Sequence, residues 1–162
     1  MIENKIEVYG GFVATFDEEH YTYKFFVPWL SRDIEVWLSS GDLEDEKEMD
    51  HLKKTFERFW VDKDKYLKMG QDDIKSKLIP YISTHKSDIP HLNYPKVSPD
   101  DFDAEYWLTS VYISAMTDSY TDVQLNFNKE DDELNLDELS VRRDINTGYL
   151  EFYAAFNPIT ID

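Results

Sequence analysis

The chain has 162 residues, no cysteine and a formal net charge of −17 at neutral pH. This length fits one domain, and 41% apolar and 15% aromatic residues are enough for a packed core, which excludes a disordered chain. The lack of cysteine excludes disulfides, thiolate zinc sites and a cysteine nucleophile. The acidic charge repels phosphate groups, so we expect neither a nucleic acid nor an anionic membrane as partner.

The N-terminal residues give an expectation about location. The stretch MIENKIEVYGGF holds no apolar run long enough for a signal peptide or a membrane span. We therefore expect a cytoplasmic protein.

The first forty residues predict three strands. Residues 5–16 are apolar and β-branched, and a glycine pair near the middle indicates a bulge or a close backbone approach. Apolar and polar residues alternate over 21–27, which is typical of a half-buried strand that Pro28 should end. A third strand is predicted over 33–39.

The spacing of apolar residues then changes to that of a helix. From Leu43 to Trp60 they recur at helical intervals, with Asp42 as the expected N-cap. Gly70 indicates a break, and a second helix is predicted after it, shortened or kinked by Pro80.

A proline-containing connector and a second group of strands are predicted next. Residues 86–99 hold three prolines, and the motif SPDD at 98–101 predicts a short helical turn. Four strands follow, at 106–116, 123–128, 139–145 and 150–156. The chain is thus expected to form a single α+β domain over 1–162, a two-layer structure with a largely antiparallel sheet and helices on one face.

The histidines give little support for catalysis. Glu48 and His51 lie on one face of the first predicted helix, but a di-iron carboxylate site needs a second copy of this pair on a facing helix. The remaining histidines are His20, His85 and His91. The sequence contains no phosphate-binding loop, nucleophile elbow or zinc-protease motif. We expect no catalytic residue, metal site or cofactor.

An acidic stretch is the most distinctive feature of the sequence. Residues 128–138 read NKEDDELNLDE, with six carboxylates in eleven positions. An EF-hand loop needs glycine at its sixth position and glutamate at its twelfth, and no register here supplies both. Two interpretations stay open: a solvated connection whose leucines pack back onto the core, or a surface for a basic protein. The second assigns partner binding to Asp131, Asp132, Glu133, Asp137 and Glu138.

Trp37 is the tryptophan that we expect to be exposed. It shares a strand face with Glu35, opposite the face of Ile34 and Val36. Because tryptophan often anchors protein interfaces, Trp37 is a further candidate partner-binding residue.

The order of these segments resembles known families. An IEVWL strand, a helix with an acidic start, SPDDF, an apolar strand and a DINTGYLEF hairpin follow one another. This layout is similar to small uncharacterised bacterial proteins, the domain-of-unknown-function families 2262 and 2004, over roughly residues 6–156. Such domains often accompany toxin systems, in which small acidic proteins serve as immunity partners, and the resemblance implies such a role.

Charge and resemblance together favour a non-enzymatic function. Residues 82–162 carry −11 of the −17 charge and would steer a basic partner. We expect a protein-binding protein, most plausibly an immunity protein that neutralises a basic toxin domain. The alternatives are a regulatory or scaffolding domain with an unrelated partner, and a hydrolase that uses carboxylates or a metal.

Overall fold

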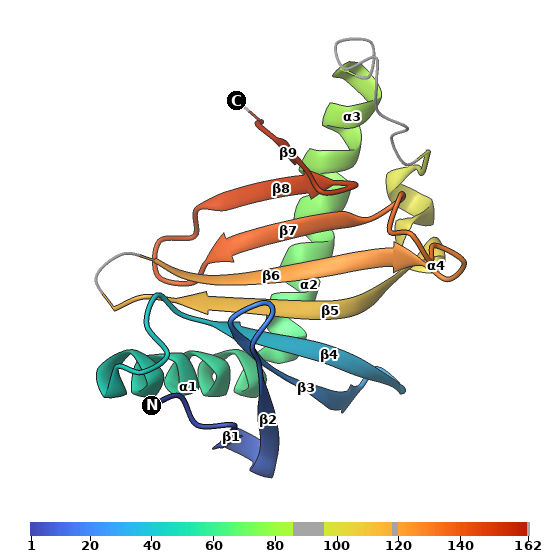
Figure 1. Ribbon diagram of the computed structural model, residues 1–162. Helices are drawn as coiled ribbons and strands as arrows, with labels where there is room; N and C mark the ends of the chain where they lie inside the picture. The colour runs from blue at the N-terminus through green and yellow to red at the C-terminus, as the bar shows by residue number, and fades with distance from the viewer. Residues whose placement is uncertain (86–95, 118–119, 162) are drawn as a thin grey trace. The chain divides into compact units, whose positions relative to one another are not determined.

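The computed structural model describes residues 1–85, 96–117 and 120–161 (Figure 1). Within these residues nine strands form one sheet in the order β1 to β9, so the predicted α+β fold is confirmed. The strands are β1 (Lys5–Val8), β2 (Phe12–Asp17), β3 (Thr22–Trp29), β4 (Arg32–Ser39), β5 (Tyr106–Ala115), β6 (Thr121–Lys129), β7 (Leu139–Asp144), β8 (Leu150–Ala154) and β9 (Asn157–Ile159). The helices are α1 (Glu46–Val61), α2 (Lys63–Asp73), α3 (Ile79–His85) and α4 (Phe102–Glu105).

The residues group into two compact units. Unit 1 comprises Met1–Lys63, Ser110–Gln124 and Arg143–Tyr149. Unit 2 comprises Asp64–Thr109, Leu125–Arg142 and Leu150–Asp162. None of the helices in the described part of the chain is long and apolar enough to cross a membrane.

The N-terminal segment of unit 1 forms two strands where one bulged strand was expected. Gly10 and Gly11 have φ angles of 87° and 79°, in the left-handed region that glycine adopts without a steric penalty. Two such residues in succession reverse the chain, so β1 and β2 pair antiparallel, with Val8 opposite Phe12. The last expected strand is divided in the same way, because Ala155 and Phe156 have positive φ and separate β8 from β9.

Pro28 does not end β3, contrary to expectation. It pairs with Asp33 of β4, and the reversal follows at Leu30 and Ser31, whose φ angles are 60° and 59°. The described pairing of β2 with β3 extends only to Lys24, which lies opposite Thr15. Pro28 therefore has no β2 partner that would need its missing N–H.

Helix α1 begins three residues later than predicted. The side chain of Asp45, rather than that of Asp42, accepts the N–H of Lys47 at 2.8 Å and caps the helix. Asp42 instead accepts the N–H of Glu44 at 2.9 Å and shapes the preceding turn. Both aspartates suit an N-cap by type, so the sequence alone did not separate them.

Aromatic contacts fix α1 on the sheet of unit 1. The ring of Phe56 lies 5.2 Å from that of Phe25 in β3, and Phe59 lies 6.0 Å from Trp29, both nearly perpendicular. Trp60 extends the cluster by an edge contact with Phe12 of β2 at 5.4 Å. Phe56, Phe59 and Trp60 are among the apolar positions that the helical spacing of the sequence predicted for this face.

One strand pair in unit 1 is parallel. Strand β5 lies beside β4 with Val36 opposite Val111 and Leu38 opposite Ile113. A parallel pair requires a long crossover, and residues 40–105, which include the helices, supply it. Val36, Val111, Leu38 and Ile113 are all fully buried, as expected of a central strand.

In unit 2, α2 passes through Gly70 without a break. The interruption between α1 and α2 falls at Asp62 instead. Gly70 is buried, and a Cβ atom there would lie 2.7 Å from Leu125 of β6 and 3.2 Å from Val141 of β7. Glycine thus allows the helix backbone to approach the sheet closely.

Pro80 is accommodated by a change in helix pitch. A π-helical turn, Ile74–Leu78, precedes α3, and the N–H of Ile79 bonds to the carbonyl of Ile74. Such wider turns occur where the regular hydrogen-bond ladder is interrupted, as proline requires. Residues 86–95 of the expected connector, including His91, lie outside the described residues.

The predicted helical turn at 98–101 is confirmed. Ser98 accepts the N–H of Asp101 at 3.3 Å, Pro99 begins the turn, and α4 follows directly. Phe102 of α4 packs edge-on against Phe127 of β6, with ring centroids 5.4 Å apart. Helices α2 and α4 thus cover the face of β6 that carries Leu125 and Phe127.

We predict that Gly70→Ala destabilises the protein. Alanine favours a helix by about 1 kcal/mol over glycine, whereas overpacking a core costs about 1–3 kcal/mol. Val141 is β-branched and buried, so it cannot move aside easily. Urea unfolding should show a lower free energy of unfolding for the variant. An increase in stability would contradict the close helix–sheet approach.

Candidate functional site

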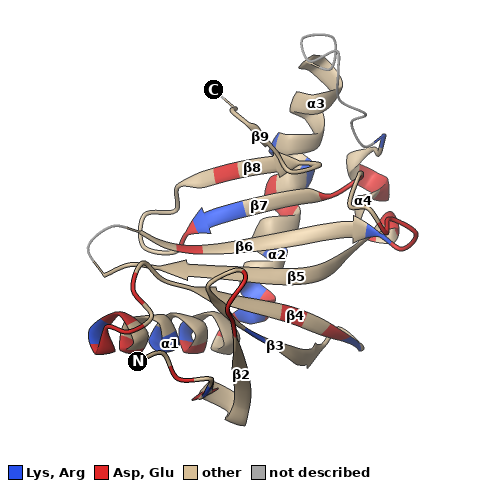
Figure 2. Ribbon diagram, viewed as in Figure 1, with Lys and Arg blue, Asp and Glu red and all other residues tan. Residues whose placement is uncertain are grey.

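The residues 130–138, called here the acidic loop, connect β6 to β7 in unit 2. Figure 2 shows this loop and the nearby α4 as a concentration of acidic residues. The two interpretations of its sequence differ in where its leucines and carboxylates point.

Asp132 organises the acidic loop from within. Its carboxylate accepts the N–H of Leu136 at 2.7 Å and that of Asp137 at 3.0 Å. It also accepts the side-chain amide of Asn128 at 3.2 Å. An aspartate that bonds backbone N–H groups farther along the chain holds a turn in place. Asp132 is therefore a structural residue of the loop. The sequence alone did not distinguish it from the neighbouring acids predicted to bind a partner.

The buried Asn128 ties the acidic loop to β5. Its side-chain N–H also donates to Asn135 at 2.9 Å, and its oxygen accepts the hydroxyl of Thr109 at 2.7 Å. Asn135 has a φ angle of 57°, a left-handed conformation that asparagine tolerates. The loop thus has a defined conformation based on a buried amide.

Glu138 is buried at the end of the loop, with 8% of its surface exposed. Burial raises the pKa of its carboxyl above the ordinary value, while hydrogen bonds from Ser140 and Asn128 oppose the shift. The Ser140 hydroxyl lies 3.3 Å from the carboxylate, and the N–H of Ala155 donates to the Glu138 carbonyl at 2.8 Å. A buried carboxyl is poorly placed to meet a partner from solution.

Leu134 and Leu136 project from the loop into solvent. Their exposed fractions are 74% and 58%, so neither packs back onto the core. Asp131 and Glu133 are also exposed, and Asp137 is half-buried. Of the five candidate acids, Asp132 is also half-buried and Glu138 alone is buried.

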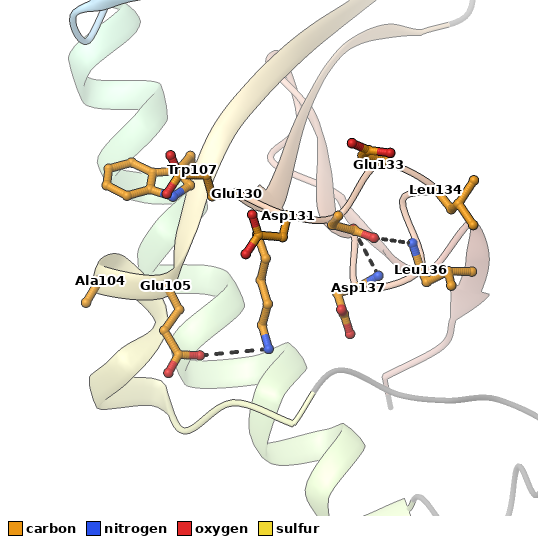
Figure 3. A pocket seen from close by; sticks show the side chains of 11 residues that line it. Ala104, Glu105, Trp107, Glu130, Asp131, Glu133, Leu134, Leu136 and Asp137 are labelled. Carbon is orange, nitrogen blue, oxygen red and sulfur yellow. Dashed lines mark hydrogen bonds and ion pairs between the residues drawn. The ribbon is translucent and has the colours of Figure 1, made fainter.

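The acidic loop, α4 and the start of β5 surround a hollow of about 700 Å³, called here the Trp107 hollow (Figure 3). Six of its eleven lining residues are acidic. The lining comprises Ala104, Glu105, Trp107, Lys129, Glu130, Asp131, Asp132, Glu133, Leu134, Leu136 and Asp137. Lys129 is the basic residue among them, and its ammonium lies 4.0 Å from the Glu105 carboxylate. The hollow thus combines apolar surface with excess negative charge.

A nearby phenol reflects the negative potential of this region. Burial raises the pKa of Tyr106 well above its ordinary value, and the carboxylates of Asp137 and Glu105 raise it further. The part of this shift that the two carboxylates cause reflects their negative charge beside Tyr106.

Trp107, rather than the expected Trp37, is the exposed tryptophan. Its exposed fraction is 37%, because it and Thr109 alternate along β5 with the buried Tyr106 and Leu108. This alternation is visible in the sequence, but the strong apolar character of the segment obscured it.

Trp37 itself is half-buried in unit 1. Its indole N–H donates to Glu35, and the ammonium of Lys24 lies 5.3 Å from its ring centre. Trp37 does not line the Trp107 hollow.

The Glu48–His51 pair is used for structure in unit 1. The Glu48 carboxylate accepts hydrogen bonds from the backbone and hydroxyl of Thr117, and from the hydroxyl of Ser40 at 3.3 Å. The His51 ring lies 3.1 Å from the Thr121 hydroxyl. Both side chains thus connect α1 to the segment around β6.

Comparisons with known proteins add no assignment. No family model matches the chain, and searches of curated proteins and of solved structures found no match. Any functional proposal therefore rests on the geometry of the acidic loop and the Trp107 hollow.

We predict that Asp132→Ala disorders the acidic loop. Three N–H groups lose their acceptor, and a lost acceptor of this kind costs about 1–3 kcal/mol. Hydrogen exchange should quicken at the amides of Leu136 and Asp137. The matched variant Asp131→Ala changes an exposed neighbour and should leave these rates unaltered. Equal exchange in both variants would contradict the role of Asp132.

A second prediction concerns Glu138 and pH. Its pKa is raised in the folded state, so the folded protein is favoured while the carboxyl is protonated and loses stability as pH rises through the folded pKa. Glu138→Gln resembles the protonated form. The variant should be more stable than the parent at pH 7 by about 1 kcal/mol and equal to it near pH 4.

Urea unfolding at the two pH values measures this difference. Glu133→Gln, which changes an exposed carboxyl of the same loop, is the control and should show no such gain. A Glu138→Gln variant that is less stable than the parent at pH 7 would refute the assigned environment.

Proposed function

We propose that the protein is a non-enzymatic binding protein whose Trp107 hollow receives a cationic surface of another protein. The observation that carries this proposal is the joint exposure of Trp107, Leu134 and Leu136 beside accessible carboxylates. Apolar side chains presented together on a surface are typical of interaction sites.

The apolar residues would supply most of the affinity. Leu134 and Leu136 leave water only if another molecule covers them, and Trp107 is of the type enriched at the centres of interfaces. The hydrogen bonds of Asp132 hold the loop that carries both leucines. A partner would therefore bind a formed surface and spend little free energy on ordering it.

The carboxylates would select the partner by charge. Asp131, Glu133 and Asp137 lie beside the leucines, so a lysine or arginine can place its aliphatic stem on the leucines and its charged end near a carboxylate. Excess negative charge also raises the association rate with a basic protein and repels an acidic one.

The resemblance to the domain-of-unknown-function families 2262 and 2004 suggests the identity of this partner. In toxin systems of this kind small acidic proteins serve as immunity partners, and the net charge of −17 of this chain fits a basic partner. We propose that the partner is a toxin domain of this kind and that the chain neutralises it in the cytoplasm.

Co-purification from the native source, followed by binding measurements on the isolated pair, tests this function. The partner should be basic, and its affinity should fall between about 0.05 and 0.5 M NaCl, because salt screens the attraction. Leu134→Ser with Leu136→Ser should weaken binding at least about tenfold, the effect of losing one interface anchor. Asp131→Asn with Glu133→Gln should mainly slow association.

A charge-matched control separates the loop from the general charge of the protein. Glu7→Gln with Glu57→Gln removes two exposed carboxylates of unit 1 and should leave affinity within about twofold. A partner that loses affinity with this control pair but not with the loop variants would overturn the proposal. Binding that is indifferent to salt would do the same.

A further inference from the structure

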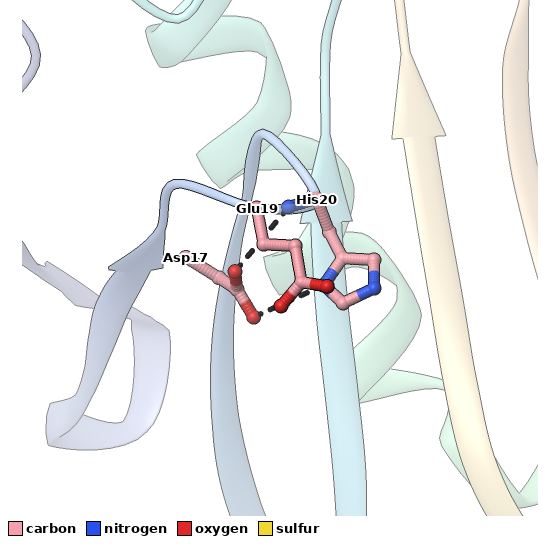
Figure 4. Close-up of side chains that lie close together, drawn as sticks. All are labelled: Asp17, Glu19 and His20. Atoms are coloured by element: carbon pink, nitrogen blue, oxygen red, sulfur yellow. Dashed lines mark hydrogen bonds and ion pairs between the residues drawn. The ribbon is translucent and has the colours of Figure 1, made fainter.

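The turn between β2 and β3 in unit 1 brings three potential metal ligands together (Figure 4). They are the carboxylates of Asp17 and Glu19 and the imidazole of His20. One ligand atom from each lies within 4.8 Å of the others. Among the described residues, no other group of three or more histidine, aspartate or glutamate side chains brings its ligand atoms this close together.

The turn holds these ligands by contacts of its own. The N–H of His20 donates to Asp17 Oδ1 at 3.3 Å, and the His20 ring Nδ1 lies 3.2 Å from Oδ2. The His20 ring also makes a T-shaped contact with Trp37 of β4, with centroids 5.4 Å apart. The imidazole therefore contacts both a carboxylate and an indole, which restricts its rotation.

The donor set suits a divalent transition metal. Carboxylate oxygen and imidazole nitrogen are both ligands of Zn²⁺, which takes three protein ligands and a water where a coordination position is open. The Asp17 carboxylate lies within hydrogen-bond distance of His20 Nδ1 and of the Lys24 ammonium, so it already attracts positive charge in this turn.

Lys24 is the natural competitor of a metal ion here. Its ammonium lies 3.2 Å from Asp17 Oδ2, the oxygen that also faces His20. It lies 5.3 Å from the centre of the Trp37 ring as well, so it keeps one favourable contact when the ion pair opens. The Lys24 ammonium is thus a displaceable cation next to the three ligands.

We propose that Asp17, Glu19 and His20 form a Zn²⁺ site that Lys24 closes in the absence of metal. This site lies in unit 1 and is independent of the function proposed for the Trp107 hollow. Zn²⁺ would replace the ammonium at Asp17 and link this carboxylate to that of Glu19 within the turn.

Calorimetric titration of the full chain with ZnCl₂ tests the site. The parent should bind one Zn²⁺ in this turn. His20→Ala and Glu19→Gln should each lower the affinity at least about tenfold, because each removes a ligand. Glu18→Gln is the matched control, since it removes the same charge from an exposed residue of the same turn outside the group. It should change the affinity by less than about twofold.

Lys24→Gln provides a second and opposite readout. The proposal predicts tighter Zn²⁺ binding by about three- to tenfold, because the internal competitor is removed. An acidic surface that attracts Zn²⁺ without specific ligands would respond equally to Glu18→Gln and Glu19→Gln, and that result would overturn the proposal. No uptake of Zn²⁺ by the parent or by Lys24→Gln would also overturn it.

Discussion

The hydrogen bonds accepted by Asp132 are the constraint on which the candidate site depends. The six carboxylates among the nine residues of the loop repel one another. Burial of its two leucines would lower the free energy through the hydrophobic effect. The Asp132 carboxylate opposes both tendencies, because it ties the N–H groups of Leu136 and Asp137 to one point. Asn128 joins that point to β5 through Thr109. The exposed leucines therefore follow from a polar network and not from a shortage of core.

Much of the α+β fold could be predicted because periodicity reports which side of an element is buried. The α1 stripe of Phe56, Phe59 and Trp60 and the alternation in β6 gave the correct elements. The errors fall where backbone conformation decides. Whether Gly10 and Gly11 make a bulge or a reversal depends on strand pairing, and whether Gly70 breaks a helix depends on what packs against it. Neither contact is visible in local sequence.

The candidate site was harder to predict, because residues of one chemical type have different environments. Asp131 and Asp132 are neighbours of identical type, yet one is exposed and the other holds the loop. Glu138 is an acid of the same cluster, but it is buried. Trp107 is hard to distinguish from a core residue because its segment is apolar on average, although it alternates with the buried Tyr106 and Leu108 along β5. Such differences arise from tertiary contacts, which composition does not encode.

We propose that the Trp107 hollow is the docking surface for a basic partner protein. Amide and indole NMR spectra of the labelled protein, titrated with the purified partner, test it most directly. If the partner docks there, the largest shifts should occur at the amides of Leu134 and Leu136 and at the indole N–H of Trp107. Saturable shifts confined to unit 1, with these three signals unchanged, would contradict it.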